Sequence, residues 1–368
     1  MEEKIIEVNF GPQHPSTHGV LRLKVKLKGE TVLSAEPIIG YLHRNAEKLS
    51  EFNYYASNTV FMDRLDYVGN HNMELGYVMA VEKLADIDVP ERAVWLRMLF
   101  VELNRIASHL VWAGTMGLDL GMITPFFYTF RERERILQLF EMVSGARLTY
   151  NYISIGGVYN DLPNEFDTKF NEFVEDFSSR LKEIESLFKE NEVFIQRMKG
   201  IGILPPEVAK SYSITGPVLR ASGVNYDIRK VSPYLYYDKV DFDIPVSNGM
   251  DNYARFEVRF REMEQSLRIV KQVYGKLPTG EYQNPLYRKS GLINIKGKGE
   301  SYVRTESPRG EFGVYVVGDG SKKPYRVRIR SPAFQNLSAT NEMVKGSKIA
   351  DMIATISTLD PVFGEVDR

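Results

Sequence analysis

Two histidines lie in a loop-forming stretch near the start of the chain, where they could deliver protons. Residues 11–19 read GPQHPSTHG and hold His14 and His18, two of the five histidines in the chain. The prolines and glycines favour a turn or loop here over a helix or a strand. Histidine changes its charge near neutral pH, so a loop histidine suits proton transfer to a bound ligand. The same polar groups could instead fix a tight turn, and the residues alone leave both interpretations open.

A tyrosine between charged residues is the second candidate. Residues 63–71 read DRLDYVGNH, which places Tyr67 directly after Asp66 and ahead of the apolar stretch 77–84. A tyrosine hydroxyl can donate a hydrogen bond to a carbonyl group, and its ordinary pKa of about 10 keeps it protonated. The alternative is an ion-paired helix start with Tyr67 as a half-buried core aromatic, which is the commoner role of a single tyrosine.

An acid among apolar residues is the third candidate. Asp119 lies in LDLG at 118–121, which we expect beyond an apolar helix that ends near Leu110. A buried carboxylate is costly unless it is paired, and a histidine partner would gain a raised pKa and a fixed tautomer. A helix cap or a solvent-facing loop acid is the alternative. Six arginines are further candidates for contact with a partner protein: Arg220, Arg229, Arg309, Arg326, Arg328 and Arg330.

The composition excludes several classes of site. The chain of 368 residues has no cysteine, so it can form neither disulfides nor thiolate-held zinc, iron–sulfur or nickel–iron centres. A formal net charge of −1 argues against a nucleic-acid interface, which needs a basic excess. The sequence contains no run of about 18 apolar residues, and its N-terminus lacks the basic start and apolar core of a secretion signal. If the protein works at a membrane, we expect another chain to hold it there.

Hydrophobic periodicity predicts strands at both ends of the chain and helices between them. Apolar residues alternate with basic ones over 21–27, which indicates a strand with one buried face. A turn at 28–30 would return the chain as a second strand over 31–35. Apolar residues at steps of three and four predict helices in the middle of the chain. The further predicted elements are helices through 99–110, 136–143 and 166–188, a strand at 325–330 and a helix at 348–359.

These elements predict an α+β fold with a helical core and sheets at both ends. Gly145 is a natural stop for the second long helix. The charged face of the 166–188 helix predicts that it lies at the surface of the bundle. The expected parts are a β-rich part with the histidine loop at 1–60, a central helical bundle at 61–280, and a β-rich part with a terminal helix at 281–368.

Longer motifs, found in one order along the chain, carry a family resemblance that covers essentially the whole sequence. They are GPQHPSTHGVLRL at 11–23, IGYLHRNAEKL at 39–49, RLDY at 64–67, ELNRIASHL at 102–110, LDLG at 118–121, TPFFYTFRERE at 124–134, IGGVYNDLP at 155–163, ESPRGEFGVYVVGDG at 306–320 and LDPVFGEVDR at 359–368. Together they resemble the quinone-site (D) subunits of respiratory complex I, a family related to the large subunit of nickel–iron hydrogenases. The implied fold is the hydrogenase large-subunit fold.

The hydrogenase resemblance explains the missing cysteines. In the hydrogenases, one pair of cysteines near each end of the chain holds nickel and iron. In this sequence Asp66 and Gly69 stand at the first pair, Val362 and Glu365 stand at the second, and Arg368 replaces a final histidine. Without thiolates a nickel–iron site cannot form. The resemblance implies that the vacated cavity became a site for a quinone head group.

The resemblance also implies roles for single residues. His18 and Tyr67 are expected to bind the two quinone carbonyls as catalytic residues, and Asp119 is expected to pair with His18. Arg44 and Arg64 are expected near the iron–sulfur cluster of an adjoining subunit. The chain would bind no cofactor and no metal itself. Quinone is its expected substrate, reduced by electrons from that tetranuclear cluster.

The implied function is that of one subunit in a larger enzyme. The chain would be a peripheral-arm subunit of NADH:quinone oxidoreductase, a proton-pumping translocase of the respiratory chain, and would be inactive alone. Its expected partners are the iron–sulfur small subunit (B), the C subunit, and the A and H subunits of the membrane arm, which would hold it at the cytoplasmic face of the cell membrane. One alternative is a hydrogenase large subunit, against which the missing cysteines argue. The other is a non-catalytic scaffold, which would have no need of His18, Tyr67 and Asp119.

Overall fold

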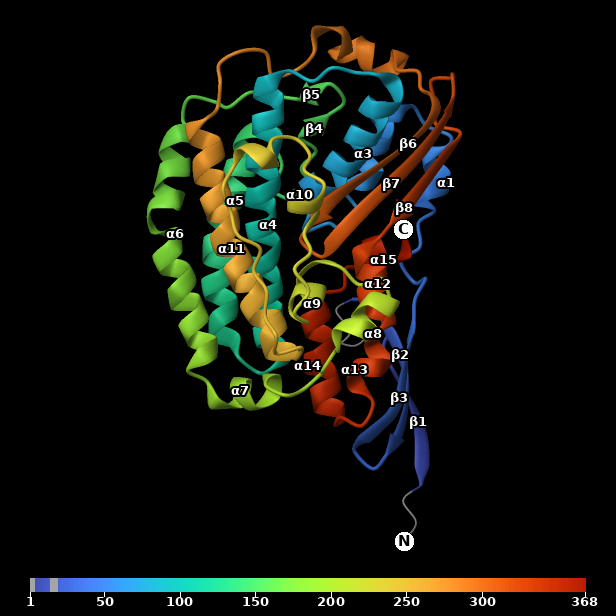
Figure 1. The fold of residues 1–368 in the computed structure, drawn as a ribbon, viewed down its shortest axis with the longest axis vertical. Coiled ribbons are helices and arrows are strands. Elements are labelled where there is room, and N and C mark those ends of the chain that lie inside the picture. Colours follow the sequence, from blue (N-terminus) through green and yellow to red (C-terminus); the bar gives the residue numbers. More distant parts are fainter. Residues whose placement is uncertain (1–3, 14–18) are drawn as a thin grey trace.

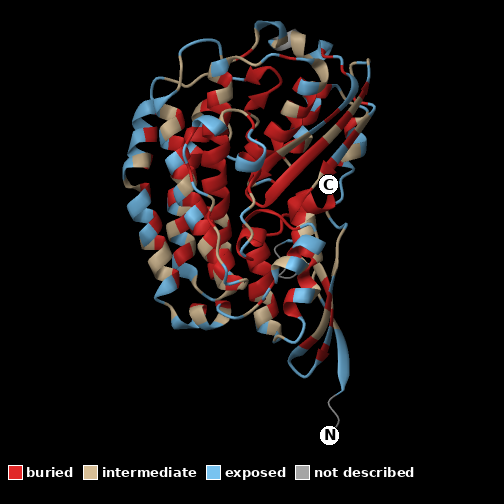
Figure 2. Ribbon diagram, viewed as in Figure 1, coloured by how far each residue is buried: buried red, intermediate tan, exposed pale blue. Residues whose placement is uncertain are grey.

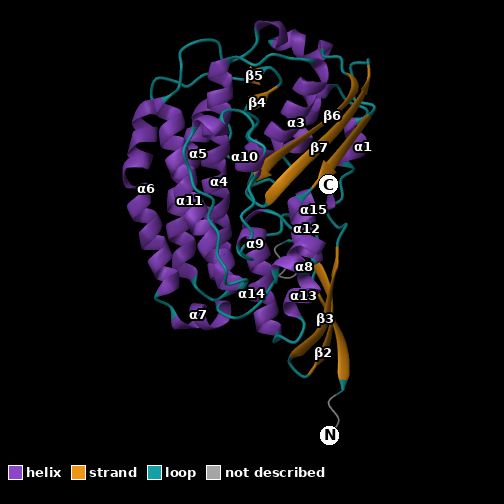
Figure 3. Ribbon diagram, viewed as in Figure 1, coloured by secondary structure: helices purple, strands orange, loops and turns teal. Residues whose placement is uncertain are grey.

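A bundle of long helices and two three-stranded sheets make up most of the described fold, and the predicted α+β class is confirmed. The computed structural model describes residues 4–13 and 19–368. Figure 1 shows the bundle on one side, a C-terminal sheet beside its upper part, and an N-terminal sheet at the lower end. Short helices from the C-terminal part of the chain lie between the two sheets (Figure 3).

The alternating leucines near the N-terminus form a strand, as predicted. Strands β1 (Ile5–Phe10), β2 (Arg22–Lys28) and β3 (Thr31–Ile38) form an antiparallel sheet in that order. Every second residue of β2 is buried, because only its apolar side chains face the core. The turn between β2 and β3 passes through Gly29 at φ 58°, a left-handed conformation that glycine adopts at little cost.

The first long helix of the bundle extends further than predicted. Helix α4 (Glu91–Asp119) was expected to end near Leu110, but it continues to Asp119 and is followed by α5 (Ile123–Ser144). The two helices pack closely at Gly114, where a Cβ atom would lie 2.5 Å from the Thr129 hydroxyl. Tertiary packing of this kind outweighs the low helix propensity of glycine, so α4 does not stop there.

A stripe of phenylalanines attaches the outermost helix to the bundle. Helix α6 (Phe166–Lys189) packs against α5 and α11 (Asn252–Gly275), and α11 packs against α4. The opposite face of α6 is exposed (Figure 2), so the predicted surface position is confirmed. The predicted stop of α5 at Gly145 is also confirmed, with φ at 74°. The buried residues of α6 form the predicted stripe: Phe166, Phe170, Phe173, Phe177, Leu181, Ile184 and Phe188.

Helix α3 (Asn70–Ala85) connects the bundle to the C-terminal sheet. It packs against α4 on one side and against the first two strands of the sheet on the other. The approach is close, because a Cβ atom at Gly76 would lie 2.7 Å from the ring of Phe312. The sheet has three antiparallel strands in chain order, and the predicted strand at 325–330 is its last: β6 (Lys298–Ser307), β7 (Gly310–Asp319) and β8 (Arg326–Arg330).

The two ends of the chain meet in one apolar core. The buried leucines and valines of β2 and β3 pack with residues of α14 (Ile349–Leu359), the predicted terminal helix, and of α15 (Phe363–Asp367). The division into parts at 1–60, 61–280 and 281–368 stays a prediction. Among the described residues, no helix is both long and apolar enough to span a bilayer.

The remaining helices and strands are short. The helices are α1 (Ala46–Ser50), α2 (Thr59–Met62), α7 (Glu192–Met198), α8 (Pro206–Ser211), α9 (Gly216–Arg220), α10 (Ile228–Val231), α12 (Pro332–Ser338) and α13 (Thr340–Val344). The 3-10 turns are η2 (Tyr55–Asn58), η3 (Tyr237–Lys239), η4 (Pro285–Tyr287) and η5 (Lys289–Asn294). A two-stranded hairpin consists of β4 (Ile153–Ser154) and β5 (Gly157–Val158).

Candidate functional site

Tyr67 lies in the turn that joins α2 to α3, and the neighbouring Asp66 shapes this turn. Oδ1 of Asp66 accepts hydrogen bonds from the backbone N–H groups of Val68 at 3.2 Å and Gly69 at 3.0 Å. Asp66 is fully buried, whereas Tyr67 keeps 36% of its surface exposed. The local sequence therefore fixes the turn through a buried carboxylate and leaves the phenol at the surface.

Replacing Gly69 with alanine should disrupt this turn. A Cβ atom at position 69 would lie 2.3 Å from Oδ2 of Asp66, so the carboxylate must move away from its backbone partners. We expect a loss of about 1–3 kcal/mol, the usual cost of overpacking a buried position. Thermal denaturation of the purified assembly measures it. Gly275→Ala is the matched control, because a Cβ atom there meets nothing within 4 Å; equal stability of the two variants would contradict the prediction.

Arg309 joins the Tyr67 turn to the C-terminal end of α14. Its Nη1 donates to Oδ2 of Asp66 at 2.6 Å and to the Ser108 hydroxyl at 2.9 Å, and its Nη2 donates to Oδ1 of Asp360 at 3.0 Å. Although burial alone would lower the pKa of Arg309, the carboxylates of Asp360 and Asp66 raise it above its ordinary value. The guanidinium is therefore a permanent cation between two buried carboxylates from distant parts of the chain.

Residues of α15 pack against the charged cluster that Arg309 forms with Asp66 and Asp360. Gly364 packs directly on the Tyr67 turn, because a Cβ atom there would lie 2.5 Å from a backbone carbonyl oxygen of the turn. The next residue, Glu365, is buried, and its Oε1 accepts a hydrogen bond from the Ser331 hydroxyl at 2.9 Å. Burial raises the pKa of Glu365 to about 7, with the Asp66 carboxylate adding to the rise and Arg309 opposing it. The cluster therefore contains a carboxyl group that titrates near neutral pH.

Two further arginines lie beside the turn, at the surface. Nη2 of Arg44 donates to the backbone carbonyl of Arg64 at 2.5 Å, and Arg64 pairs with Asp63 at 2.7 Å. The Asp367 carboxylate holds the segment before Arg44, because it accepts from backbone N–H groups within 40–42 at 2.8 and 2.6 Å. Arg44 is exposed and Arg64 is half-buried, so both are accessible to a partner in the isolated chain.

The charges of this cluster act on the Tyr67 hydroxyl. Partial burial raises the pKa of Tyr67, Arg309 and Arg44 oppose the rise, and the carboxylates of Asp66 and Asp360 add to it. The hydroxyl therefore stays protonated through the neutral range and can donate a hydrogen bond to a ligand. An exposed phenol backed by buried charges of both signs is suited to binding a polar carbonyl compound.

Comparison with known proteins decides the family. The family described as "Respiratory-chain NADH dehydrogenase, 49 Kd subunit" matches this chain over residues 119–292 and 291–368, which is more than half of its length. The chain belongs to this 49-kDa subunit family. It is 49% identical to the D subunit of NADH-quinone oxidoreductase from Dehalococcoides mccartyi, over 98% of both chains. It is 47% identical to the D 2 subunit of the same kind of enzyme from Solibacter usitatus, over 98% of this chain and 96% of the relative.

A third relative extends the match to the whole chain. The identity to the D subunit of NADH-quinone oxidoreductase from Thermus thermophilus is 46%, over 100% of this chain and 95% of the relative. The predicted resemblance to the D subunits of complex I is confirmed. Of the positions predicted to match hydrogenase cysteines, Asp66 and Glu365 lie in the cluster around Arg309.

The structure of this family member brings Tyr67, Arg44 and Arg64 together but places Asp119 elsewhere. Asp119 is the last residue of α4 and is half-buried, rather than part of a loop beyond the helix. It lies about three helical turns beyond Ser108, which corresponds to about 16 Å along the axis. His18 lies outside the described residues, so its pairing with Asp119 and its role in binding quinone stay predictions.

The prediction that six arginines contact a partner is wrong for three of them. Arg220, Arg229 and Arg309 are fully buried and form ion pairs within the chain. Arg220, for example, contacts Glu262 and donates to Glu306 at 2.7 Å. The physical reason is that a buried guanidinium can satisfy several carboxylates at once. The other three stay candidates for partner contact: Arg326, Arg328 and Arg330.

Sequence reasoning missed a buried charge network inside the bundle. Glu102, Arg105 and His109 follow one another on α4 at steps of three and four residues, and all three are fully buried. Nε2 of His109 contacts Oε2 of Glu262 at 2.9 Å, and Nη1 of Arg229 donates to Oε1 of Glu102 at 3.1 Å. The available signal was the motif ELNRIASHL, which places three ionisable side chains on one face of a mainly apolar helix.

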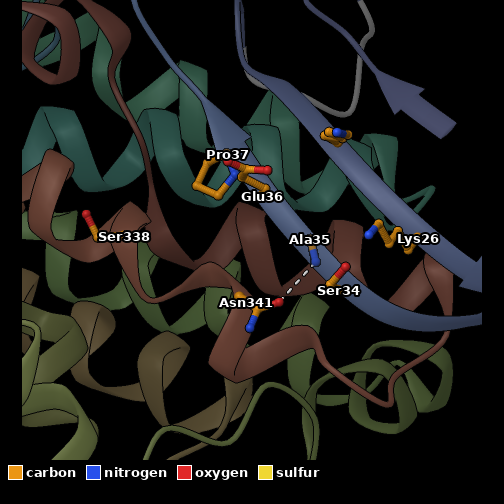
Figure 4. A pocket seen from close by; sticks show the side chains of 8 residues that line it. Lys26, Ser34, Ala35, Glu36, Pro37, Ser338 and Asn341 are labelled. Carbon is orange, nitrogen blue, oxygen red and sulfur yellow. Dashed lines mark hydrogen bonds between the residues drawn. The ribbon is translucent and has the colours of Figure 1, made fainter. Parts of the chain in front are cut away.

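A separate hollow lies on the N-terminal sheet and contains none of the predicted site residues (Figure 4). This cavity of about 360 Å³ is lined by Lys24 and Lys26 of β2, residues 34–37 of β3, and Ser338 and Asn341. Oδ1 of Asn341 accepts a hydrogen bond from the N–H of Ala35 at 3.1 Å, so the hollow lies where this bond joins β3 to α13. Within 4–13 and 19–368, no group of three or more His, Asp or Glu side chains is placed to hold a metal ion.

Proposed function

We propose that this chain is the quinone head-group subunit of an NADH–quinone oxidoreductase. The observation that carries the proposal is the position of Tyr67, exposed beside the buried Asp66–Arg309–Asp360 chain of charges. The names of its full-length relatives, all D subunits of NADH-quinone oxidoreductases, support the reaction class. The matched positions of Asp66 and Glu365 support an origin from a hydrogenase-like metal site.

Tyr67 and His18 would bind the quinone ring through its two carbonyl oxygens. The Tyr67 hydroxyl would donate a hydrogen bond to one carbonyl, and the His18 imidazole would donate to the other. Both bonds would strengthen as electrons arrive and negative charge develops on the oxygens. Asp119 would hold His18 in a protonatable state.

The reaction would join one quinone, two electrons and two protons to form one quinol. The electrons would come from a tetranuclear iron–sulfur cluster in the iron–sulfur small subunit (B), because this chain has no cysteine to hold a cluster. Arg44 and Arg64 would face that cluster from the surface beside the Tyr67 turn. Proton loss from His18 would change the charge next to Asp119, and this change would start coupling to proton translocation in the membrane arm.

The chain would work as a peripheral part of the enzyme rather than alone. The B and C subunits would contact it in the peripheral arm, and the A and H subunits would hold it at the cytoplasmic face of the cell membrane. NADH would be oxidised by another part of the complex.

A photoreactive quinone analogue tests the proposal on the purified complex. We expect the label on this chain within residues 63–69 or 360–368, and we expect excess native quinone to reduce the labelling. Mass spectrometry of proteolytic fragments locates the label. Labelling confined to other subunits would overturn the proposal and favour the scaffold alternative.

A further inference from the structure

Arg259 is a buried cation whose donors are only partly satisfied. It lies on α11, is fully buried, and stacks on the indole of Trp112 with 4.5 Å between the guanidinium carbon and the ring centroid. Its Nη1 donates to the backbone carbonyl of Arg255 at 3.2 Å. Its Nε and Nη2 have no hydrogen-bond partner among the described residues. Burying a charge with free donors is costly, so something must contact these two nitrogens.

Other unsatisfied polar atoms gather where α4, α11 and the end of α14 meet. The Ser357 hydroxyl, Oδ2 of Asp360 and Nδ1 of His109 are buried, and none has a partner in the described part of the chain. Trp112 ties this region together, because its indole N–H donates to the backbone carbonyl of Ser357 at 2.8 Å. Buried donors and acceptors that have no protein partner are the usual sign of internal water.

The charge balance gives Arg259 a role in this region. The carboxylates of Asp66 and Asp360 share one direct cation, Arg309. Asp360 is the carboxylate that acts most strongly on Arg259, ahead of Glu262. Glu262 already contacts Arg220. Arg259 is therefore the second cation available to balance the second carboxylate.

We propose that buried water joins Arg259 to Asp360, and that Arg259 is thereby a positioning residue of the candidate site. It would act through Asp360 and Arg309 on the Tyr67 turn, without touching the quinone. The proposed water would be bound by residues of this chain alone and does not depend on the proposed function. The effect on the reaction rests on the proposed function.

Several charged groups face Asp360 and Arg259, and the sign of the pH effect follows from them. Arg309 pairs directly with both Asp66 and Asp360, and Asp360 is the carboxylate that acts most strongly on Arg259, so removing Arg259 leaves one cation for two carboxylates. Only a proton can then balance the second negative charge, so the cluster of the variant should bind a proton at a higher pH than the wild-type cluster does. The charged groups that act on Arg259, Asp360 or their partners are His109 on α4, Arg255 and Glu262 on α11, Arg220 on α9, Arg309 in the β6–β7 turn, Asp66 and Tyr67 in the turn before α3, and Glu365 on α15.

The pH profile of quinone reduction by the purified complex tests the positioning role. We expect Arg259→Met to move the acidic limb of the profile up by about one pH unit, the lower end of the shift that a neighbouring charge causes. The activity at pH 6 should fall several-fold, and the activity at pH 8 should stay near the wild-type value. Arg259→Lys should keep the wild-type profile, because it keeps the charge.

Two controls keep the test decisive. Lys271→Met removes an exposed charge from the same helix and should leave the profile unchanged. Ferricyanide reduction by the same preparations reports intact electron transfer ahead of the quinone site, because it does not require that site. A loss of activity that is equal at all pH values, or that Arg259→Lys also shows, would mean that Arg259 only fills space and would overturn the positioning role.

A structure of the complex at a resolution that shows water tests whether water joins Arg259 to Asp360. We expect ordered water within hydrogen-bond distance of Nε or Nη2 of Arg259 and of Oδ2 of Asp360. Absence of this water overturns the inference, whatever quinone labelling shows. Water together with an unshifted profile in Arg259→Met overturns the positioning role. Failure of the proposed function alone would instead appear as missing quinone label with the water present.

Discussion

Replacing Tyr67 with phenylalanine should lower quinone reduction by the assembled complex by about 10²-fold, the usual effect of losing one positioned donor to a developing negative charge. The substitution removes only the hydroxyl, so the ring keeps its packing beside Asp66. Burial raises the pKa of Tyr67, so the wild-type hydroxyl is protonated throughout the working range and the loss should be the same at pH 6 and pH 8. Steady-state quinone reduction by the purified complex measures it.

Tyr67→Phe should not change electron transfer to the iron–sulfur clusters of the complex. Ferricyanide reduction takes electrons before the quinone site, so Tyr67→Phe should leave it near the wild-type rate. Tyr325→Phe is the matched control, because Tyr325 is 69% exposed and lies outside the cluster around Arg309. If Tyr67→Phe reduced quinone at the wild-type rate, Tyr67 would not bind the substrate. A parallel fall in ferricyanide reduction would point to faulty assembly instead.

Local sequence pattern predicted those elements whose burial follows one regular period. The alternation over 21–27 became β2, and the phenylalanine stripe became the buried face of α6. In both cases one face of one element meets the core, so the period alone gives the answer. The prediction that α4 ends near Leu110 was wrong for a different reason. The apolar stripe that predicted this helix ends at Leu110, but Gly114 lies at a close contact with α5, and that contact is decided by residues elsewhere in the chain.

The sequence indicated the chemistry of the candidate site, but not the ion pairs that support it. Tyr67 could be named from its residue type and from the RLDY motif, whereas a helix start was the alternative to its functional role. Its charged support was not foreseen, because Arg309 lies 243 positions from Asp66 along the sequence. Arg309 was named as a candidate for partner contact, because most arginines are exposed. No local pattern shows that this one is buried between two carboxylates.

Removing the Arg309 cation should destabilise the protein more than any other single change considered. Arg309→Met keeps much of the side-chain volume but leaves the carboxylates of Asp66 and Asp360 without their shared partner. Breaking a buried ion pair from one side costs about 3–5 kcal/mol, because the remaining charge is uncompensated. Thermal denaturation of the purified complex, followed by release of this chain, measures the loss. Arg180→Met is the control, because a surface pair such as Arg180–Asp176 contributes only about 0–1 kcal/mol.

The pH dependence of this loss separates lost charge from lost packing. Burial raises the pKa of Asp66 and Arg309 opposes the rise, so the variant should carry a pKa raised further. A carboxyl group whose folded pKa exceeds its unfolded value loses stability as pH rises from the unfolded value to the folded one. The deficit of Arg309→Met should therefore be larger at pH 8 than at pH 6. Adding Asp66→Asn should restore part of the stability, because the amide oxygen can still accept from Gly69 while one uncompensated charge is gone. An equal deficit at both pH values, with no gain in the double variant, would mean that Arg309 contributes packing rather than charge.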